Sequence, residues 1–243
     1  MKMLKKTRGI VLHSLKYGET GIITTIYTEV FGRMSFLVQG THGKKSLIKG
    51  NLLRQLFLLE MEVDYKPGRD LQRIREIKNI SPFGSIPYVI VKSSQVLFLA
   101  EILHKVLREE ESRPDLFEFL FHSIQILDLL EAGINNFSLI FLVQFARFIG
   151  FAPINNYSES NQYFDMLAGK FVSSPPSHLW FLKNRESLLF SQLLGMSYQN
   201  LSEFRPDKGS RNVLTDFILD YFGLHLGNKL NLKSLEILRE VLH

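Results

Sequence analysis

The chain has 243 residues, more than the ~100–150 of a typical domain, so its length allows one large domain or two modest ones. Hydrophobic residues make up 45% of the chain and aromatic residues 12%, which excludes a disordered, collagen-like or low-complexity protein. The absence of Cys excludes a disulfide scaffold, a thiolate nucleophile and any Cys-ligated zinc or iron–sulfur centre.

Positive charge is concentrated near the N-terminus. The first 80 residues hold 15 Lys+Arg and 7 Asp+Glu, a net charge of +8, whereas the remaining residues have a net charge of −3. This asymmetry indicates a polyanionic partner for the N-terminal part, either a nucleic acid or an anionic membrane surface. No signal peptide is recognisable, and the longest apolar segment, 137–151, is shorter than a membrane span and contains Gln144 and Arg147. We therefore expect a soluble, cytoplasmic protein without a membrane partner.

Residues 7–80 contain short runs of β-branched and aromatic residues separated by glycines, a pattern typical of β-strands. Five strands are predicted, at about 8–15, 22–31, 33–39, 52–65 and 71–80. A five-stranded unit of this size protects its edges by forming a small barrel such as the OB-fold. We therefore predict a barrel domain over residues 1–80.

From residue 81 onward the apolar residues follow the helical period. Helices are predicted at about 96–106, 114–132, 136–149, 186–200, 210–222 and 232–242. Residues 152–180 are rich in Pro, Asn and Ser and are expected to form a long irregular loop. The predicted fold class is α+β, mainly α by residue count, with an OB-fold barrel followed by a helical domain over residues 81–243.

The sequence offers no catalytic constellation. Its seven His residues show no metal-ligand spacing, and a Gly-x-Ser-x-Gly motif is absent. The segment 40–46 approaches a phosphate-binding P-loop, but Val38 and Lys45 stand where that motif requires Gly and Ser/Thr. We therefore predict a protein that is not an enzyme and has no cofactor and no metal site, and we disfavour the alternative of a nucleotide hydrolase.

Basic residues near the predicted strand ends can converge on one groove of a small barrel, where they would track a phosphate backbone. The candidate nucleic-acid-binding residues are Lys5, Lys6, Arg8, Arg33, His42, Lys44, Lys45, Lys49, Arg54, Arg73 and Arg75. The rings of Tyr17, His42 and Tyr65 are candidates for stacking on bases. The alternative is a solvated hairpin with an incidental pair of lysines and aromatic rings that belong to the core.

Several segments, in the same order along the chain, resemble the bacterial RecO recombination mediator family. They are residues 9–12, 17–19, 22–28, 31–35, 40–46, 148–153 and 217–238. The resemblance implies an OB-fold followed by a helical domain and a non-enzymatic role in recombinational repair. It further implies binding to single- and double-stranded DNA, strand annealing, and work with RecR to replace single-strand-binding protein by the recombinase. The acidic tail of single-strand-binding protein would bind the helical domain.

The chain departs from the family pattern in two places. The resemblance places the DNA contacts at Arg33, Lys44 and Lys45, but Gln39 and His42 stand where the family commonly has Lys and Arg. This departure would either lower the affinity of the loop or shift DNA binding toward Lys49, Arg73 and Arg75. Many members also hold a four-Cys zinc site after the segment that ends at Pro153, and this chain has no Cys there. An aromatic cluster of Tyr157, Tyr163, Phe164 and Phe171 is the predicted replacement. The alternative function is an interaction or scaffold protein whose helical domain binds partners while the barrel tethers it to DNA or RNA.

Overall fold

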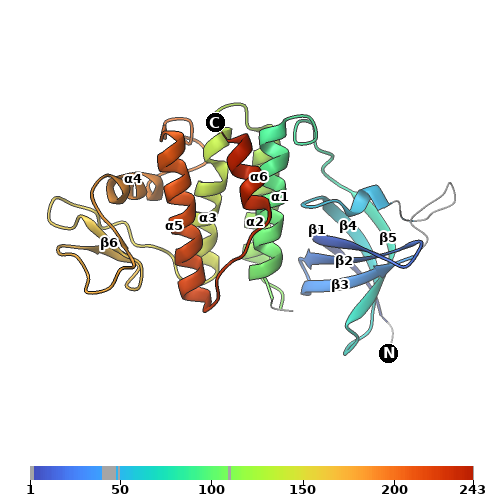
Figure 1. Cartoon of the computed structure of the whole chain (residues 1–243). Coiled ribbons are helices and arrows are strands. Elements are labelled where there is room, and N and C mark those ends of the chain that lie inside the picture. The colour runs from blue at the N-terminus through green and yellow to red at the C-terminus, as the bar shows by residue number, and fades with distance from the viewer. Residues whose placement is uncertain (1–2, 40–47, 49, 109–110, 243) are drawn as a thin grey trace. The chain divides into compact units, whose positions relative to one another are not determined.

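The computed structural model describes residues 3–39, 48, 50–108 and 111–242 (Figure 1). An N-terminal barrel precedes a series of helices, and helices take 39% and strands 25% of the residues, which confirms the predicted fold class. The chain divides into two compact units, Met1–Leu129 and Leu130–His243. The first unit therefore contains two helices beyond the barrel.

Five strands form the barrel: β1 (Met3–Tyr17), β2 (Gly21–Thr28), β3 (Gly32–Val38), β4 (Leu58–Tyr65) and β5 (Leu71–Asn79). Their order around the barrel is β1-β2-β3-β5-β4, and it closes because β1 pairs with both β2 and β4. The β3–β5 contact is parallel, through Ser35 opposite Leu71 and Phe36 opposite Gln72. A five-stranded barrel with this closure matches the predicted OB-fold.

The length of β1 lets one strand serve two neighbours. Residues Met3 to Ile10 pair with β4, and Gly9 to Tyr17 pair with β2, with a bulge in that pairing between Val11 and His13. Such a bulge bends a strand and increases its twist, which a small barrel requires. Inside the barrel, Val11, Ile26 and Phe36 are fully buried in one apolar cluster with residues of β4.

The predicted strand over 52–65 begins only at Leu58. The residues before it form a short 3-10 helix, Gly50–Leu53, that buries Leu53 against Val38. Leu56 has a left-handed backbone, with φ of 57°, and its N–H donates to Val11 O at 2.7 Å. Leu53 and Leu56 are therefore buried before the strand begins at Leu58, an arrangement that periodicity alone does not distinguish from one long strand.

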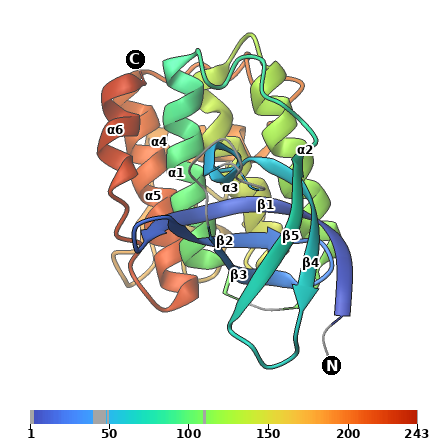
Figure 2. The same cartoon turned by 90° about the vertical axis from the view of Figure 1, so that its right-hand side faces the viewer.

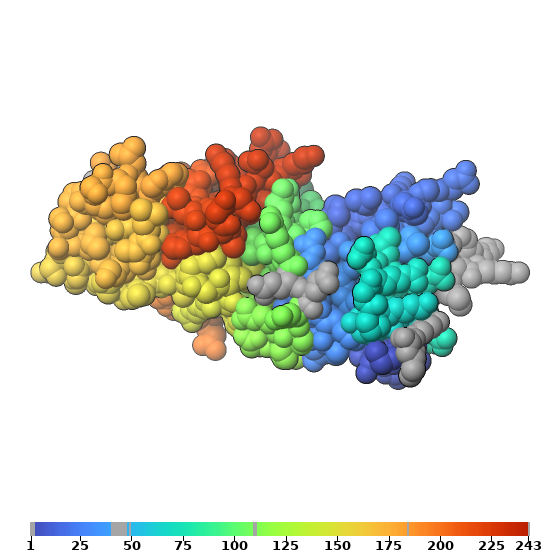
Figure 3. All heavy atoms as spheres, turned by 90° about the horizontal axis from the view of Figure 1, so that it is seen from below, coloured from blue at the N-terminus to red at the C-terminus, as the bar shows by residue number. Residues whose placement is uncertain are grey.

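Two helices of the first unit, α1 (Ile90–Val106) and α2 (Pro114–Leu129), pack against the barrel (Figure 2). The ring of His104 on α1 lies 4.7 Å from that of His13 on β1, and Phe117 on α2 stacks on Tyr27 of β2. The blue barrel atoms meet the green atoms of α2 in the space-filling view (Figure 3). The outer face of β1 and β2 is thus partly covered within this unit.

The connection that leads into α1 is fixed to the end of α2 by Asp128. Its carboxylate accepts the backbone N–H groups of Gly84, Ser85 and Ile86, at 2.7 to 2.9 Å. The buried Lys92 donates to Ser85 Oγ and to the carbonyl of Asp128. This network ties the beginning of α1 to the end of α2.

The second unit contains α3 (Phe137–Phe148), α4 (Asn184–Leu194), α5 (Lys208–Leu226) and α6 (Ser234–Val241). Both α4 and α5 contact α3. Segment 152–180, predicted as irregular, carries the short strands β6 (Tyr163–Asp165) and β7 (Lys170–Val172), which form a small sheet with β8 (Phe181–Leu182). Among the described residues, no helix combines the length and apolar character that crossing a membrane requires.

Candidate nucleic-acid interface

The outer face of β1, β4 and β5 carries many of the predicted basic residues, but carboxylates lie between them. Two cross-strand rows run over these three strands: Lys6–Glu62–Glu76 and Arg8–Glu60–Lys78. Lys6 Nζ lies 3.4 Å from Glu62 Oε1, and its side chain is 80% exposed. Because residues directly opposite each other interact, the acidic central strand β4 offsets the basic residues on either side.

Arg73 and Arg75 are both exposed on β5. A register shift lies opposite Glu62 and Val63, so that Glu76 and Arg75 are consecutive exposed residues. Arg73 lies opposite Asp64, and Arg75 Nε lies 3.2 Å from Asp64 Oδ1. A phosphate bound by these arginines would therefore compete with a carboxylate of the same sheet.

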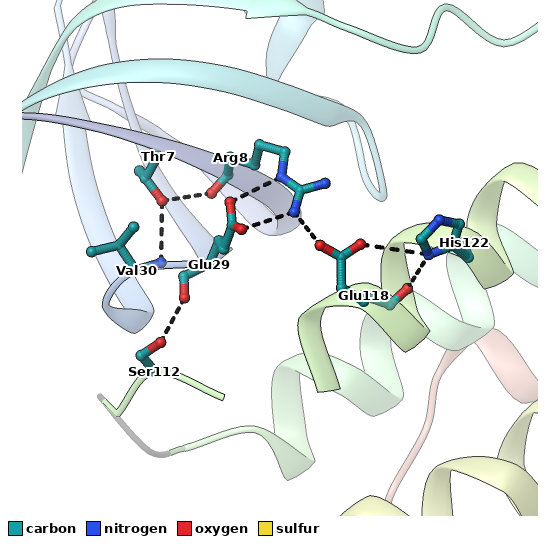
Figure 4. Close-up of polar contacts among 7 residues, drawn as sticks. All are labelled: Thr7, Arg8, Glu29, Val30, Ser112, Glu118 and His122. Carbon is teal, nitrogen blue, oxygen red and sulfur yellow. Dashed lines mark hydrogen bonds and ion pairs between the residues drawn. The ribbon is translucent and has the colours of Figure 1, made fainter. Parts of the chain in front are cut away.

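Arg8 is held between the barrel and α2 (Figure 4). Its Nε and one terminal nitrogen donate to the two carboxylate oxygens of Glu29, at 2.9 and 2.8 Å, and that nitrogen also donates to Glu118. The guanidinium lies 5.1 Å from the ring centres of Phe117 and Phe121. Arg8 thus connects β1, the β2–β3 turn and α2.

The electrostatics of Arg8 match this geometry. Its hydrogen bond with Glu29 raises the pKa of Arg8 and lowers the pKa of Glu29. Glu118 also accepts from Arg8 and lies beside His122 one helical turn further along, while Ser112 donates to the carbonyl of Glu29. A phosphate contact by Arg8 would require breaking a bidentate ion pair, so the arrangement favours a structural role, and DNA binding by Arg8 stays a prediction.

Arg33, at the start of β3, closes the C-terminal end of α1. One of its terminal nitrogens donates to the carbonyls of His104 and Leu107, at 2.5 and 2.6 Å. These carbonyls belong to the last turn of the helix, where backbone acceptors lack intrahelical donors and carry partial negative charge. The geometry assigns Arg33 a helix-capping contact, and its DNA contact stays a prediction.

The other predicted residues are partly outside the described structure. His42, Lys44, Lys45 and Lys49 lie outside the described residues, so the proposed basic loop stays a prediction. Lys5 and Arg54 are both exposed, on β1 and just after the 3-10 helix.

The two described rings proposed for base stacking differ in their surroundings. Tyr65 stacks on Phe31, with ring centres 4.6 Å apart, and thereby helps to pack the barrel end. Tyr17 is 56% exposed at the end of β1. Of these two rings, Tyr17 is the better placed to meet a base.

A basic hollow lies where β3 meets the end of α1. Its volume is about 500 Å³, and the described residues that line it are Arg33, His104, Lys105 and Arg108. The sequence reasoning missed Lys105 and Arg108 because it confined the basic surface to residues 1–80. Two basic residues close together at the end of the helix predicted over about 96–106 were the available signal.

The segment that would hold zinc in many relatives is packed by aromatic rings. Phe164 is fully buried, and its ring centre lies 5.0 Å from Phe171 and 4.7 Å from Phe190. Tyr157 packs edge-on against Phe171, as predicted, but Tyr163 points to the opposite face of β6 and contacts Phe181 instead. No group of three or more metal-ligating side chains occurs among the described residues. These residues do not fit a zinc ion.

Comparison with known proteins covers nearly the whole chain. The family profile described as "Recombination protein O N terminal" matches residues 1–83, and "Recombination protein O C terminal" matches residues 88–236. Proteins named "DNA repair protein RecO" from Phocaeicola vulgatus and Bacteroides fragilis are 42% identical to this chain, over 98% of it and 99% of their own length. One of the same name from Flavobacterium psychrophilum is 34% identical over 97% of this chain and 98% of its own length.

Proposed function

Because this chain belongs to the RecO family of DNA repair proteins, we propose that it is a recombination mediator that binds single- and double-stranded DNA and anneals complementary strands. The observation that carries the proposal is the closed OB-type barrel in a chain that matches the family over nearly its full length. Barrels of this kind commonly bind oligonucleotides along one face and its adjoining loops.

Charge explains how such a protein would act. Two complementary strands repel each other through their phosphates, and a protein that neutralises phosphates on both strands allows the bases to pair. Phosphate contacts hold a strand without reading its sequence, which suits an annealing factor. The unit Met1–Leu129 carries 19 Lys+Arg and 14 Asp+Glu, whereas Leu130–His243 carries ten of each, so the first unit accounts for the whole net charge of +5.

Annealing requires no covalent step. In the proposed function the protein is therefore not an enzyme and uses no cofactor or metal. The P-loop-like segment lacks the Gly and hydroxyl residue that a nucleotide-binding loop requires. In this proposal the protein acts on the chromosome in the cytoplasm.

The proposed partners extend the role from annealing to recombinase loading. Together with RecR, the protein would act on strands coated with single-strand-binding protein, whose tail it would bind, and would thereby help the recombinase to replace that protein. Family membership supports this step.

The experiment that tests the function is annealing of complementary strands coated with single-strand-binding protein, with and without RecR. We expect faster pairing when this protein is added, without any nucleotide, and recombinase loading only when RecR is also present. Pairing no faster than in its absence would contradict the proposal.

Two double variants locate the binding surface. Lys44→Ala with Lys45→Ala should weaken binding to all sequences about equally, because phosphate contacts carry no sequence information. Arg73→Ala with Arg75→Ala should weaken it less, because Asp64 already offsets these arginines. A larger loss in the strand pair would place the binding site on β5, as the departures at Gln39 and His42 suggested.

A second candidate function is a scaffold whose helical part binds partners while the barrel only tethers it to nucleic acid. The acidic residues of β4, which offset the neighbouring cations, favour this alternative because they reduce the charge available for holding two strands. A scaffold would bind DNA but would not accelerate annealing, so the same experiment separates the two functions.

A further inference from the structure

The hollow between β3 and the end of α1 contains three cations from two elements. Arg33 comes from the barrel, and Lys105 and Arg108 come from the last turn of α1 and the residues just beyond it. None of the described residues that line it is acidic. Glu101 lies 3.8 Å from Lys105, one helical turn away, a separation longer than a hydrogen bond.

Arg33 offsets the partial negative charge at the C-terminal end of α1, which would otherwise repel an anion. The C-terminal end of a helix presents carbonyl groups and partial negative charge. Arg33 donates to two of these carbonyls, those of His104 and Leu107, and places its guanidinium over the helix end. The mouth of the hollow is therefore positive even though it adjoins a helix C-terminus.

Arg108 retains donors that face no acceptor in the described part of the chain. Its Nε–H donates to Lys105 O at 3.2 Å, and no described residue accepts from its two terminal nitrogens. An arginine presents its terminal nitrogens as a fork that matches two oxygens of a phosphate. Lys105 lies in the last turn of α1 and Arg108 two residues beyond its end, and both line the hollow.

We propose that this hollow binds backbone phosphates of nucleic acid, with Lys105 and Arg108 as binding residues and Arg33 as the residue that positions the helix end. The proposal rests on the function proposed above and extends its binding surface from the barrel onto the first helix. The binding surface would therefore extend beyond the predicted domain boundary at residue 80 and stay within the compact unit Met1–Leu129.

The test compares the full-length protein with Lys105→Ala/Arg108→Ala in binding to an oligo(dT) strand and to a duplex of equal length, over a range of salt concentrations. Alanine preserves the helix, and both replaced side chains are at least partly exposed, so the fold should be retained. The matched control is Lys183→Ala/Lys208→Ala, which removes two exposed cations from the second unit. Lys105→Arg/Arg108→Lys retains both charges and serves as the conservative variant.

We expect the alanine pair to weaken binding about tenfold at low salt and to reduce the slope of log K against log salt by about 1.4 for the single strand and about 1.8 for the duplex. The control pair should match the wild type in affinity and in slope, and the variant that retains both charges should match it in slope. If the alanine pair matches the control, the hollow binds no phosphate, although the proposed function stands. If the wild type itself binds no DNA, the proposed function and this inference both fail.

Discussion

The guanidinium of Arg8 is shared by carboxylates from two elements, Glu29 and Glu118, and covers the rings of Phe117 and Phe121. Replacing Arg8 by Ala would leave two carboxylates close together with no cation between them. We expect Arg8→Ala to lower the free energy of unfolding by about 2–4 kcal/mol, measured by urea denaturation followed by circular dichroism.

Lys6→Ala is the matched control for Arg8→Ala. The Lys6 side chain is 80% exposed, so its ion pair with Glu62 should contribute less than about 1 kcal/mol to the free energy of unfolding. If Arg8→Ala were as stable as Lys6→Ala but bound DNA more weakly, Arg8 would be a phosphate ligand, as its position in the sequence suggested.

His104 gives the first unit a pH-dependent stability. Burial lowers the pKa of His104 to about 4, Arg33, His13 and Lys105 act in the same direction, and Glu101 opposes them. In the unfolded chain its pKa is about 6.5. As the pH falls from 6.5 to about 4, the unfolded state takes up a proton that the folded state does not, so the free energy of unfolding should decrease in this window and stay unaffected above it.

The measurement is urea denaturation at pH 7, 6 and 5 for the wild type and for His104→Asn, in which this decrease should be smaller. Glu29 and Asp128 do not contribute to the pH dependence measured in this window. Hydrogen bonding to Arg8 lowers the pKa of Glu29; burial would raise that of Asp128, but backbone N–H donors lower it. Their contributions are therefore lost only below about pH 4.5. Equal pH dependence in both proteins would contradict the role of His104.

The residue types predicted where positive charge lies on the strands, but not which carboxylates lie beside it. The basic residues of β1 and β5 were recognisable, yet Glu60, Glu62 and Asp64 of β4 offset them only because of the strand register, which the sequence does not reveal. The helix contacts of Arg8 and Arg33 span 110 and 71 positions of the chain, beyond the reach of any local pattern.

Among the elements, the β2–β3 turn depends on Gly32. Its φ is +65°, and a Cβ there would lie 2.3 Å from the backbone oxygen of Glu111 in the connection between α1 and α2. Gly18, with φ of +63°, has no described atom within 4 Å of such a Cβ. We expect Gly18→Ala to cost about 1 kcal/mol of stability through backbone strain alone, and Gly32→Ala at least about 2–3 kcal/mol, by urea denaturation. Equal losses would show that the connection moves away freely.

The small sheet of the second unit depends on Phe164. This fully buried ring contacts Phe171 on the neighbouring strand and Phe190 and Phe217 on two helices. We expect Phe164→Ala to lower the free energy of unfolding by about 3–5 kcal/mol, because it removes a whole ring from a closed cluster. Trp180, the only Trp of the chain, follows β7 and reports the unfolding of this unit by its fluorescence.

Tyr157→Ala is the matched control for Phe164→Ala, since Tyr157 is only half-buried and meets Phe171 edge-on. It should cost about 1 kcal/mol. A Phe164→Ala protein as stable as this control would remove the aromatic cluster as the feature that holds the segment without zinc.

Element type was predictable where the apolar period was sustained. The face of α2 formed by Leu116, Leu120, Ile124 and Leu127 is buried as its spacing predicted. The 3-10 helix Gly50–Leu53 and the strands β6 to β8 were missed, because each has only two to four residues and no period can be read over so short a run. Closure of the five strands followed from the cost of open edges, but the β3–β5 contact that completes it involves only two residue pairs.

For the molecule as a whole, the division of charge depends on where the chain is divided. Cut at residue 80, the helical part has a net charge of −3; cut after Leu129, the second unit has a net charge of zero. The acidic excess therefore belongs to residues 81–129, which pack with the barrel and supply Glu118 to Arg8. The family profiles divide near residue 83, so the boundary at residue 80 stays a prediction.

The salt dependence of DNA binding follows from this distribution. About four to six phosphates should be neutralised, because several barrel cations are already offset by carboxylates, and each contributes ~0.7 to the slope for a single strand. We therefore expect log K for an oligo(dT) strand to fall with log salt at a slope of roughly −3 to −4, measured by fluorescence anisotropy. A fragment of residues 130–243 lacks net charge and serves as the control if it folds; it should bind far more weakly. A slope near zero for the full chain would mean that phosphate charge does not hold the strand, and the electrostatic account of annealing would then be wrong.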